Sequence, residues 1–437
     1  MIVSQAFKGK TYAVLGLARS GLATVDTLVA SGARVVAWDS REEARAAVAD
    51  KAELGDPMEI DLAGFDGIVV SPGVPLNKHP IAMRAKIAGV PIIGDIELFA
   101  LARPTLPPHK VVGITGTNGK STTTALIHHI IEQAGFPARM GGNIGLPILG
   151  QEPLEPNLHG MGVYVLELSS YQIDLTHSLD CDVAVLLNIT PDHLDRYNGF
   201  AGYVASKARL FAMQSADHVA VIATEDEPSR GIAASAPAQL REVKAADIDP
   251  EAQLGWPSLQ GPHNAQNAAV AIAVGQALGI DEATIMAALA SYASLPHRMQ
   301  AVGTHNGVLY VNDSKATNAA STAPALGAWP ARDGKPRIHW ILGGVAKSDN
   351  LDECAPYYGN IAHAYTIGEA GHMFADLLRP HMAVDDSEML SAAVRRAARV
   401  AQPGDVVLLS PACASFDQFR DFEARGDAFA AAVNALE

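Results

Sequence analysis

A glycine-rich turn lies between an apolar run and an amphipathic run of this chain. Residues 111–124 read VVGITGTNGKSTTT, and apolar side chains recur at helical spacing through residue 131. This order predicts a strand, a phosphate loop and a helix, because a helix start presents unpaired N–H groups to an anion. We expect Lys120 to contact the β- and γ-phosphates and Ser121 to bind a bridging Mg²⁺. The general pattern places a glycine where Ile114 stands, so a Gly-rich turn with a chance Gly-Lys-Ser is the alternative.

Composition limits the class of protein. The 437 residues suffice for two or three domains, and 47 acidic against 32 basic residues give a formal net charge of −15. That charge argues against a general binder of nucleic acid or acidic membranes. The three cysteines, Cys181, Cys354 and Cys413, lie far apart, which indicates neither a disulfide framework nor a CxxC metal site. With no signal peptide and no run of about 18 apolar residues, we expect a soluble cytoplasmic protein without a membrane span.

Apolar runs alternating with helical patterns predict an α/β protein. Strands at 11–17 and 34–38, joined by a helix and followed by Asp39, indicate a Rossmann-like N-terminal domain. Its first turn is GxxxxG, not GxGxxG, so NAD or another nucleotide such as a UDP-sugar remains open. Ser71-Pro72-Gly73 follows a third strand at 65–70 and either lines the ligand crevice or forms a plain loop. The dense prolines at 103–108 end this domain near residue 100.

The central domain places polar side chains at the ends of apolar strands. Glu167 comes near the end of the strand at 163–168, where a carboxylate is costly unless it binds a cation such as Mg²⁺ or forms an ion pair. Asp192 follows the strand at 182–189 and either caps the next helix or joins the site. His193 is either structural or a ligand of metal or substrate. Lys207, in a helix at 200–213, is by pattern alone a surface lysine.

Two further segments carry candidate residues. Asn264 and Asn267 lie three apart near the start of a helix, where they either bind adenine or phosphate or cap the helix. Strands at 308–311, 338–342 and 406–409 each lead into a polar or glycine-containing loop, which predicts a C-terminal Rossmann-like domain with one shared loop edge. The lysines and hydroxyls of these loops suit a small anionic ligand.

Together these parts predict ATP-driven joining of two substrates, in which phosphoryl transfer to a carboxylate prepares it for attack by an amine. The predicted domains are residues 1–100 for one substrate, 101–297 for ATP and 298–437 for the amine. The central one is a P-loop ATPase-type domain with a mainly parallel sheet.

The motifs resemble a known family across essentially the whole chain. The segments GITGTNGKST, GGNIG, LELSSYQ, NITPDHLDRY and GPHNAQN resemble those of the amino-acid-adding Mur ligases and the folylpolyglutamate synthases. The C-terminal segments NDSKATN, LGGVAKSD and SPACASFDQFRDFEARGDAF resemble the D-glutamate-adding Mur ligases in particular. The DNPR-type motif of the diaminopimelate- and lysine-adding members is absent. The glycine spacing of the phosphate loop is the superfamily's own form.

The resemblance implies a role for each of the following residues. ATP contacts fall on Gly116, Thr117, Asn118, Gly119, Lys120, Ser121, Thr122, Asn264, Asn267, Arg298 and Asp313. Two Mg²⁺ ions fall on Ser121, Glu167, His193 and a carbamoylated Lys207, and the catalytic residues are Lys120, His193 and Lys207. D-Glutamate contacts fall on Thr317, Lys347, Ser415 and Phe422. Contacts to UDP-N-acetylmuramoyl-L-alanine fall on Leu17, Ala18, Arg19, Ser20, Asp39, Ser40, Arg41, Ser71, Pro72, Gly73 and Asn143.

The resemblance further implies a cytoplasmic monomer whose partners are small molecules and not nucleic acid. Two other classes stay open at this point. A folylpolyglutamate-type ligase shares the ATPase core, although NDSKATN and the N-terminal domain count against it. A nucleotide-operated switch would carry NKxD, but the nearest match, Asn77-Lys78-His79-Pro80, ends in proline and precedes the phosphate loop.

Overall fold

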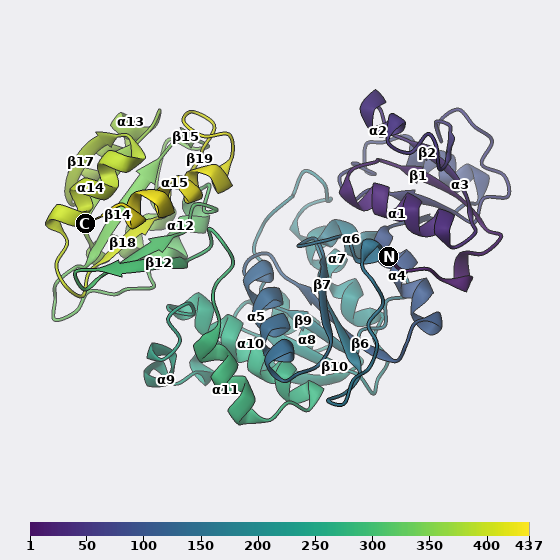
Figure 1. Cartoon of the computed structure of the whole chain (residues 1–437), viewed down its shortest axis with the longest axis horizontal. Helices are drawn as coiled ribbons and strands as arrows, with labels where there is room; N and C mark the ends of the chain where they lie inside the picture. Colours follow the sequence, from purple (N-terminus) through teal and green to yellow (C-terminus); the bar gives the residue numbers. More distant parts are fainter. Residues whose placement is uncertain (437) are drawn as a thin grey trace. The chain divides into compact units, whose positions relative to one another are not determined.

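The computed structural model describes residues 1–436, which divide into two compact units (Figure 1). The first unit is Met1–Lys244 with Ala269–Ala288, and the second is Ala245–Ala268 with Leu289–Glu437. Two sheets lie in the first unit and a third sheet lies in the second. The predicted α/β class is therefore confirmed. Residue 100 falls between the two sheets of the first unit, and residue 297 lies just before the first strand of the third sheet.

The first sheet has strand order β3-β2-β1-β4-β5 and all its pairs are parallel. This is the order of a Rossmann half, in which ligands bind beyond the carboxyl ends of the strands. Its strands are β1 (Thr11–Leu15), β2 (Arg34–Trp38), β3 (Glu53–Leu54), β4 (Gly67–Val70) and β5 (Ile92–Ile93), and its helices are α1 (Arg19–Ala30), α2 (Glu42–Ala46), α3 (Ile81–Ala88) and α4 (Asp95–Ala102).

The second sheet has order β11-β10-β9-β6-β8-β7, again wholly parallel. Its central strands are buried along their length, as expected when helices cover both faces. Its strands are β6 (His109–Thr115), β7 (Ala138–Gly142), β8 (Gly162–Glu167), β9 (Val183–Leu186), β10 (Val219–Ala223) and β11 (Gln239–Val243). The helices of this stretch are α5 (Lys120–Gln133), α6 (Ser170–Asp174), α7 (Phe200–Ala212), α8 (Glu227–Ala233), α9 (Pro250–Leu254), α10 (Pro262–Leu278) and α11 (Glu282–Ser291).

Helix α4 ties the first two sheets together. The Glu97 carboxylate, 4 % exposed, accepts hydrogen bonds from the backbone N–H groups of His177 (2.6 Å) and Ser178 (2.9 Å) and from the Ser178 hydroxyl (2.7 Å). Charge-assisted bonds of this kind are stronger than neutral ones. The segment between α6 and β9 of the second sheet is therefore held against α4, which follows the first sheet.

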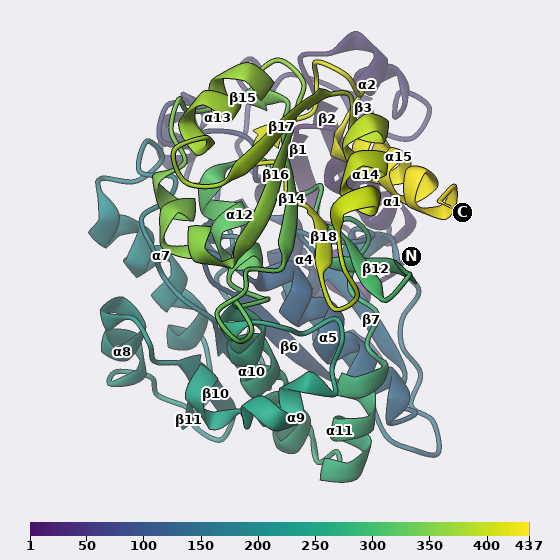
Figure 2. The same ribbon diagram turned by 90° about the vertical axis from the view of Figure 1, so that its left-hand side faces the viewer.

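The third sheet has order β12-β13-β18-β14-β16-β17, and only its β12–β13 pair is antiparallel. Figure 2, turned by 90° about the vertical axis, labels β12, β14, β16, β17 and β18 of this sheet. The strands are β12 (Gln300–His305), β13 (Val308–Asn312), β14 (Ile338–Gly343), β16 (Ile361–Ile367), β17 (Ala383–Glu388) and β18 (Val406–Leu409), with α12 (Ala319–Leu326), α13 (Gly371–Leu378), α14 (Leu390–Val400) and α15 (Phe422–Asn434). Since β13, β18 and β14 are neighbours and parallel, the predicted shared loop edge is confirmed.

A short antiparallel bridge connects two loops at this edge. It pairs β15 (Val345–Ala346) with β19 (Cys413–Ala414). Lys347 and Ser415 each follow one of its strands directly.

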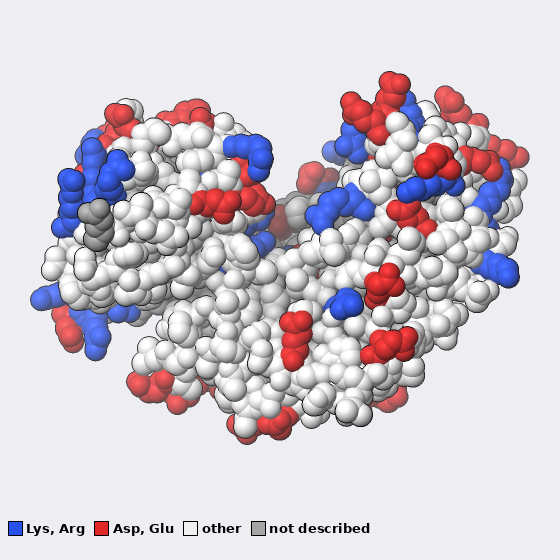
Figure 3. All heavy atoms as spheres, viewed as in Figure 1, with Lys and Arg blue, Asp and Glu red and all other residues white. Residues whose placement is uncertain are grey.

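Charge is unevenly spread over the second unit. Lys and Arg side chains gather over α14, whose Arg395, Arg396 and Arg399 are exposed (Figure 3). Within residues 1–436, no helix is both long enough and apolar enough to cross a membrane.

Candidate active site

The phosphate loop lies where the sequence predicts it, between β6 and α5. Gly116 has φ 155° and Gly119 has φ 83°, which are backbone conformations that residues with a side chain rarely adopt. A Cβ on Gly116 would lie 3.0 Å from the Cβ of Leu187. Helix α5 begins at Lys120, immediately after Gly119, so the N-terminal turn of the helix adjoins the loop.

Asn188 holds this loop in shape. Its Oδ1 accepts a hydrogen bond from the Asn118 N–H (2.9 Å), its Nδ2 donates to the Asn118 carbonyl (3.2 Å), and its own carbonyl accepts from the Thr117 N–H (2.9 Å). Sequence reasoning missed Asn188, although it stands at the start of the quoted segment NITPDHLDRY. Its position two residues after a buried strand is the signal that could have identified it.

Lys120 lies folded over the loop. Its Nζ donates to the carbonyls of Gly116 (2.9 Å) and Thr117 (2.8 Å). The ammonium charge is therefore held inside the turn that the sequence assigns to phosphate. An anion entering this turn would find both the helix N-terminus and this cation.

Glu167 carries a buried carboxylate with one unsatisfied oxygen. The residue is 2 % exposed, and its Oε1 accepts from the Asn143 amide (2.9 Å), whereas Oε2 has no hydrogen-bond partner. Register pairs Glu167 with Ile114 of β6, which places it beside the start of the phosphate loop. No ion pair to Glu167 is present among residues 1–436, so the structural ion pair considered above is not formed. An orphaned carboxylate oxygen fits a hard cation such as Mg²⁺.

Lys207 lies in the core of the site. It is 1 % exposed, so its assignment from pattern alone as a surface lysine is wrong. Its Nζ donates to the Gly116 carbonyl (2.8 Å), reaches Thr115 Oγ1 (3.4 Å) and lies 4.6 Å from the centre of the Tyr203 ring. Burial and the nearby charge of Lys120 lower the pKa of Lys207 to about 7. A lysine in this state supplies a neutral, nucleophilic amine near neutral pH.

His193 adopts a positive φ of 51° at the same strand edge. Its ring packs against Tyr171 (5.1 Å between centroids) and Tyr203 (6.2 Å). Asp192 Oδ1 accepts from the His193 N–H (2.8 Å). The helix that follows, α7, has Gly199 and not Asp192 as its N-cap, so the capping role considered for Asp192 is wrong.

No group of three or more His, Cys, Asp or Glu side chains able to hold a metal ion occurs within residues 1–436. The predicted magnesium ligands include only two residues of these types, Glu167 and His193. The remaining ligands of the prediction are a hydroxyl, on Ser121, and a modified Lys207.

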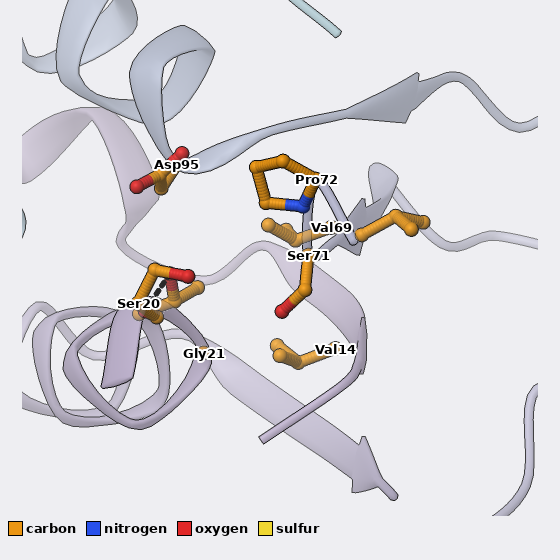
Figure 4. Close-up of a pocket in the computed structure, with 9 residues that line it drawn as sticks. Val14, Ser20, Gly21, Val69, Ser71, Pro72 and Asp95 are labelled. Atoms are coloured by element: carbon orange, nitrogen blue, oxygen red, sulfur yellow. Dashed lines mark hydrogen bonds between the residues drawn. The ribbon is translucent and has the colours of Figure 1, made fainter. Parts of the chain in front are cut away.

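The turns of the N-terminal sheet converge on a small pocket. Ser20 at the start of α1, Ser71 and Pro72 after β4, and Asp95 at the start of α4 line it (Figure 4). The Ser71 hydroxyl donates to the Gly16 carbonyl (3.0 Å), which joins the first and third turns. Burial raises the pKa of Asp95 to about 6.

Asp39 joins the first turn to the second. Its Oδ2 accepts from the Leu17 N–H (2.8 Å), and its Oδ1 accepts from the N–H (2.9 Å) and Nε (3.1 Å) of Arg41. Arg41 lowers the pKa of this carboxyl to about 2. The turns that carry Leu17, Ser20, Asp39, Arg41, Ser71 and Pro72 therefore lie together. Arg19 donates to the Gly145 carbonyl (2.8 Å), and Asn143 bonds to Glu167 instead.

The second unit gathers the other candidates on its loop edge. Lys347 Nζ donates to Thr317 Oγ1 (3.2 Å). Ser415, 2 % exposed, follows the β15–β19 bridge. Phe422 begins α15, and its ring lies 3.8 Å from Lys315 Nζ. Cations and hydroxyls beside an apolar ring suit a small amino dicarboxylic acid.

Four candidate residues for ATP also belong to the second unit. Asp313 accepts from the Ser410 hydroxyl (2.7 Å) and the Met299 N–H (3.2 Å), and burial raises its pKa to about 7. Arg298 lies close enough to Asp313 to oppose that rise. Asn267 Nδ2 donates to Asn264 Oδ1 (3.1 Å), and both amides are buried.

Family models match most of the chain. The Mur ligase MurD-like N-terminal domain matches residues 10–94, the Mur ligase middle domain 114–256, and the Mur ligase glutamate ligase domain 297–413. Proteins named UDP-N-acetylmuramoylalanine--D-glutamate ligase are similar over their full length. The one from Novosphingobium aromaticivorans is 66 % identical over 100 % of this chain and 97 % of its own, and the one from Sphingopyxis alaskensis is 64 % identical over 100 % of both. The one from Zymomonas mobilis is 58 % identical over 100 % of both.

Solved structures share the fold. The UDP-N-acetylmuramoylalanyl-D-glutamyl-2,6-diaminopimelate--D-alanyl-D-alanyl ligase from Acinetobacter baumannii has a TM-score of 0.59 at 15 % identity, covering 99 % of this chain and 92 % of its own. The UDP-N-acetylmuramate-alanine ligase from Thermotoga maritima has a TM-score of 0.55 at 16 % identity, covering 98 % and 99 %.

Proposed function

The chain belongs to the Mur ligase family, and we propose that it uses ATP to add D-glutamate to UDP-N-acetylmuramoyl-L-alanine in peptidoglycan precursor synthesis. One structural observation carries the chemistry. A phosphate loop with a helix N-terminus lies beside a buried carboxylate, Glu167, that has one free oxygen. This pairing suits the binding of a nucleoside triphosphate with a divalent cation. A protein that only binds a sugar nucleotide would not need it.

ATP binding is assigned first to the loop Gly116–Thr122. Its backbone N–H groups and the α5 dipole stabilise the phosphates, while Lys120 exchanges its two carbonyl contacts for the β- and γ-phosphate oxygens. In the second unit the assigned ATP contacts are Asn264, Asn267, Arg298 and Asp313.

Mg²⁺ ligands are assigned to Ser121, Glu167 and His193, with two ions expected. When bound, Mg²⁺ neutralises charge on the transferred phosphoryl group. Lys207 would support one ion as a carbamate, formed when its neutral amine adds to CO₂ and releases one proton. The lowered pKa of Lys207 and its short distance to the Gly116 carbonyl support this role.

The reaction proceeds in two steps. The terminal carboxylate of the UDP-linked substrate attacks the γ-phosphorus of ATP, forming an acyl phosphate and releasing ADP. The amine of D-glutamate then attacks the acyl carbon, the C–O bond to phosphate breaks, and the amine loses a proton as the amide forms. Lys120 stabilises the charge on the transferred group in the first step.

The substrates are assigned to separate loop sets. We assign the binding of UDP-N-acetylmuramoyl-L-alanine to Leu17, Ala18, Arg19, Ser20, Asp39, Ser40, Arg41, Ser71, Pro72, Gly73 and Asn143. D-Glutamate falls to Thr317, Lys347, Ser415 and Phe422, where Lys347 pairs with a carboxylate and Phe422 packs against the carbon chain. We further propose that the protein acts in the cytoplasm as a monomer.

The test is substrate-dependent phosphate release. The protein is incubated with ATP, Mg²⁺, UDP-N-acetylmuramoyl-L-alanine and either D- or L-glutamate. We expect phosphate release that requires all components and the D-isomer. ATP turnover without D-glutamate, or equal turnover with L-glutamate, would contradict the proposal.

A further inference from the structure

A buried guanidinium lies behind the amino-acid-binding loops. Arg425, on α15, is 1 % exposed and ranks among the largest fully buried side chains of the protein. No carboxylate forms an ion pair with it among residues 1–436. A buried charge of this kind is costly unless hydrogen bonds satisfy it.

Every N–H group of this side chain donates a hydrogen bond. Nε donates to Ser314 Oγ (3.0 Å), and Nη2 donates to the carbonyls of Ser314 (2.9 Å) and Cys413 (3.0 Å). Nη1 donates to the carbonyls of Gly343 (3.4 Å) and Ala414 (3.3 Å). These five contacts match the five N–H groups of a guanidinium. Burial lowers the pKa of Arg425 to about 10, so the side chain stays charged at pH 7.

The acceptors belong to three different loops. Ser314 precedes Thr317 after β13, Gly343 is the last residue of β14 and precedes Lys347, and Cys413 and Ala414 precede Ser415 after β18. The Ser314 hydroxyl also donates to the Phe422 carbonyl (2.8 Å). One side chain thus connects the backbones next to all four residues assigned to D-glutamate.

The loops are packed too closely for another arrangement to form easily. Gly344 has φ 126°, and a Cβ there would lie 2.2 Å from the Ala414 carbonyl oxygen and 3.2 Å from Arg425 Nη1. The β15–β19 bridge joins two of the loops, and the bonds from Arg425 to Ser314 tie the third to them.

We propose that Arg425 is the positioning residue that holds the three loops of the D-glutamate site in one arrangement and thereby sets the affinity for D-glutamate. This inference rests on the proposed function. Arg425 acts through Thr317, Lys347 and Ser415, because its own donors are occupied by backbone carbonyls and Ser314. Its role is therefore positioning and not catalysis.

The test compares KM values in Arg425→Met and Arg425→Lys. The expected result for Arg425→Met is a KM for D-glutamate raised about 10-fold or more, since small displacements of binding groups have large kinetic effects. The KM for UDP-N-acetylmuramoyl-L-alanine should stay unchanged, because its assigned residues belong to the first unit. Arg425→Lys should recover only part of the loss, as an ammonium has three donors and no planar fork.

Val394→Ala is the matched control for stability. Val394 is fully buried on α14 in the same unit, and none of the hydrogen bonds described for the three loops involves it. This variant should lower Tm and leave the KM for D-glutamate at the wild-type value. Millimolar guanidinium ion should lower the KM of Arg425→Ala towards wild type and leave that of Val394→Ala unchanged.

Distinct outcomes separate the two proposals. ATP turnover by the wild-type protein that does not depend on D-glutamate would contradict the proposed function itself. If wild-type turnover requires D-glutamate, two results would overturn the positioning role alone. One is an unchanged KM for D-glutamate in folded Arg425→Met, and the other is an equal rise of that KM in Val394→Ala. If Arg425→Met does not fold, Ser314→Ala removes the Nε acceptor and the bond to Phe422, and an unchanged KM for D-glutamate in that variant overturns the proposal.

Discussion

Lys207 in the first unit and Arg425 in the second are both buried cations, each 1 % exposed. Lys207 has one short hydrogen bond, to the Gly116 carbonyl, and a longer one to Thr115. Arg425 has all five donors bonded. Burial lowers the pKa of Lys207 to about 7 but leaves that of Arg425 at about 10.

The difference separates reactive groups from architectural ones. A buried group with unused bonding capacity, such as Lys207 or Glu167 Oε2, is destabilising and persists where a ligand or a reaction uses it. A buried group with every bond satisfied, such as Arg425, orders the backbone around it. Substitutions of these and neighbouring residues test this distinction.

Lys207→Ala should show the largest effect. We expect a loss in kcat on the order of 10³-fold, because the carbamate that supports the metal cannot form. Added formate or acetate should restore part of the activity. Lys207→Met should be at least as stable as wild type, since it removes a costly buried amine. Wild-type rates in either variant would refute the carbamate role.

Glu167→Gln removes the unsatisfied carboxylate oxygen and keeps an acceptor for Asn143. We expect kcat to fall on the order of 10²-fold and the Mg²⁺ requirement to rise. Thermal unfolding should change little, because the lost oxygen has no partner within the protein. An unchanged Mg²⁺ dependence of the rate would remove Glu167 from the metal site.

Asn188→Ala tests a polar side chain whose oxygen and nitrogen both bond to the phosphate loop. Loss of its bonds to Asn118 should raise the KM for ATP by about 10-fold while kcat falls less. Asn157→Ala is the matched control, because Asn157 makes similar backbone bonds in an exposed turn of the same unit. Equal KM values for ATP in the two variants would show that Asn188 does not position the loop.

Asp313→Asn tests the pH dependence of stability. Burial raises the pKa of Asp313 to about 7 in the folded protein, above its ordinary value. Folded protein therefore retains a proton that unfolded protein releases, so the contribution of Asp313 to stability falls as pH rises from about 4 to about 7. The variant should show a smaller difference in Tm between pH 5 and pH 8. Asp376→Asn, at a side chain 73 % exposed, should keep the wild-type difference.

Much of the fold follows from sequence pattern. Apolar strands followed by glycine or polar turns identified β6, β8, β9, β13, β14 and β18 to within a few residues. Parallel strands then bring their carboxyl ends to one edge, which explains why the candidate residues after β13, β14 and β18 lie together.

Which polar side chains are buried was harder to predict from the sequence. Lys207 reads as a surface residue because a helical pattern does not reveal which face packs on the sheet, and only the family resemblance placed it in the site. Asn188 and Arg425 were missed for a related reason. Their bonds go to backbone atoms of loops distant in sequence, and no residue spacing records such contacts.

Isotope transfer from the substrate carboxylate to phosphate tests whether the reaction passes through an acyl phosphate. UDP-N-acetylmuramoyl-L-alanine labelled with ¹⁸O in both oxygens of its terminal carboxylate is turned over with ATP, Mg²⁺ and D-glutamate in unlabelled water. Attack of the carboxylate on ATP predicts that each released phosphate carries one ¹⁸O atom, because the acyl C–O bond breaks when the amine attacks. Phosphate without ¹⁸O would show that the carboxylate does not attack ATP.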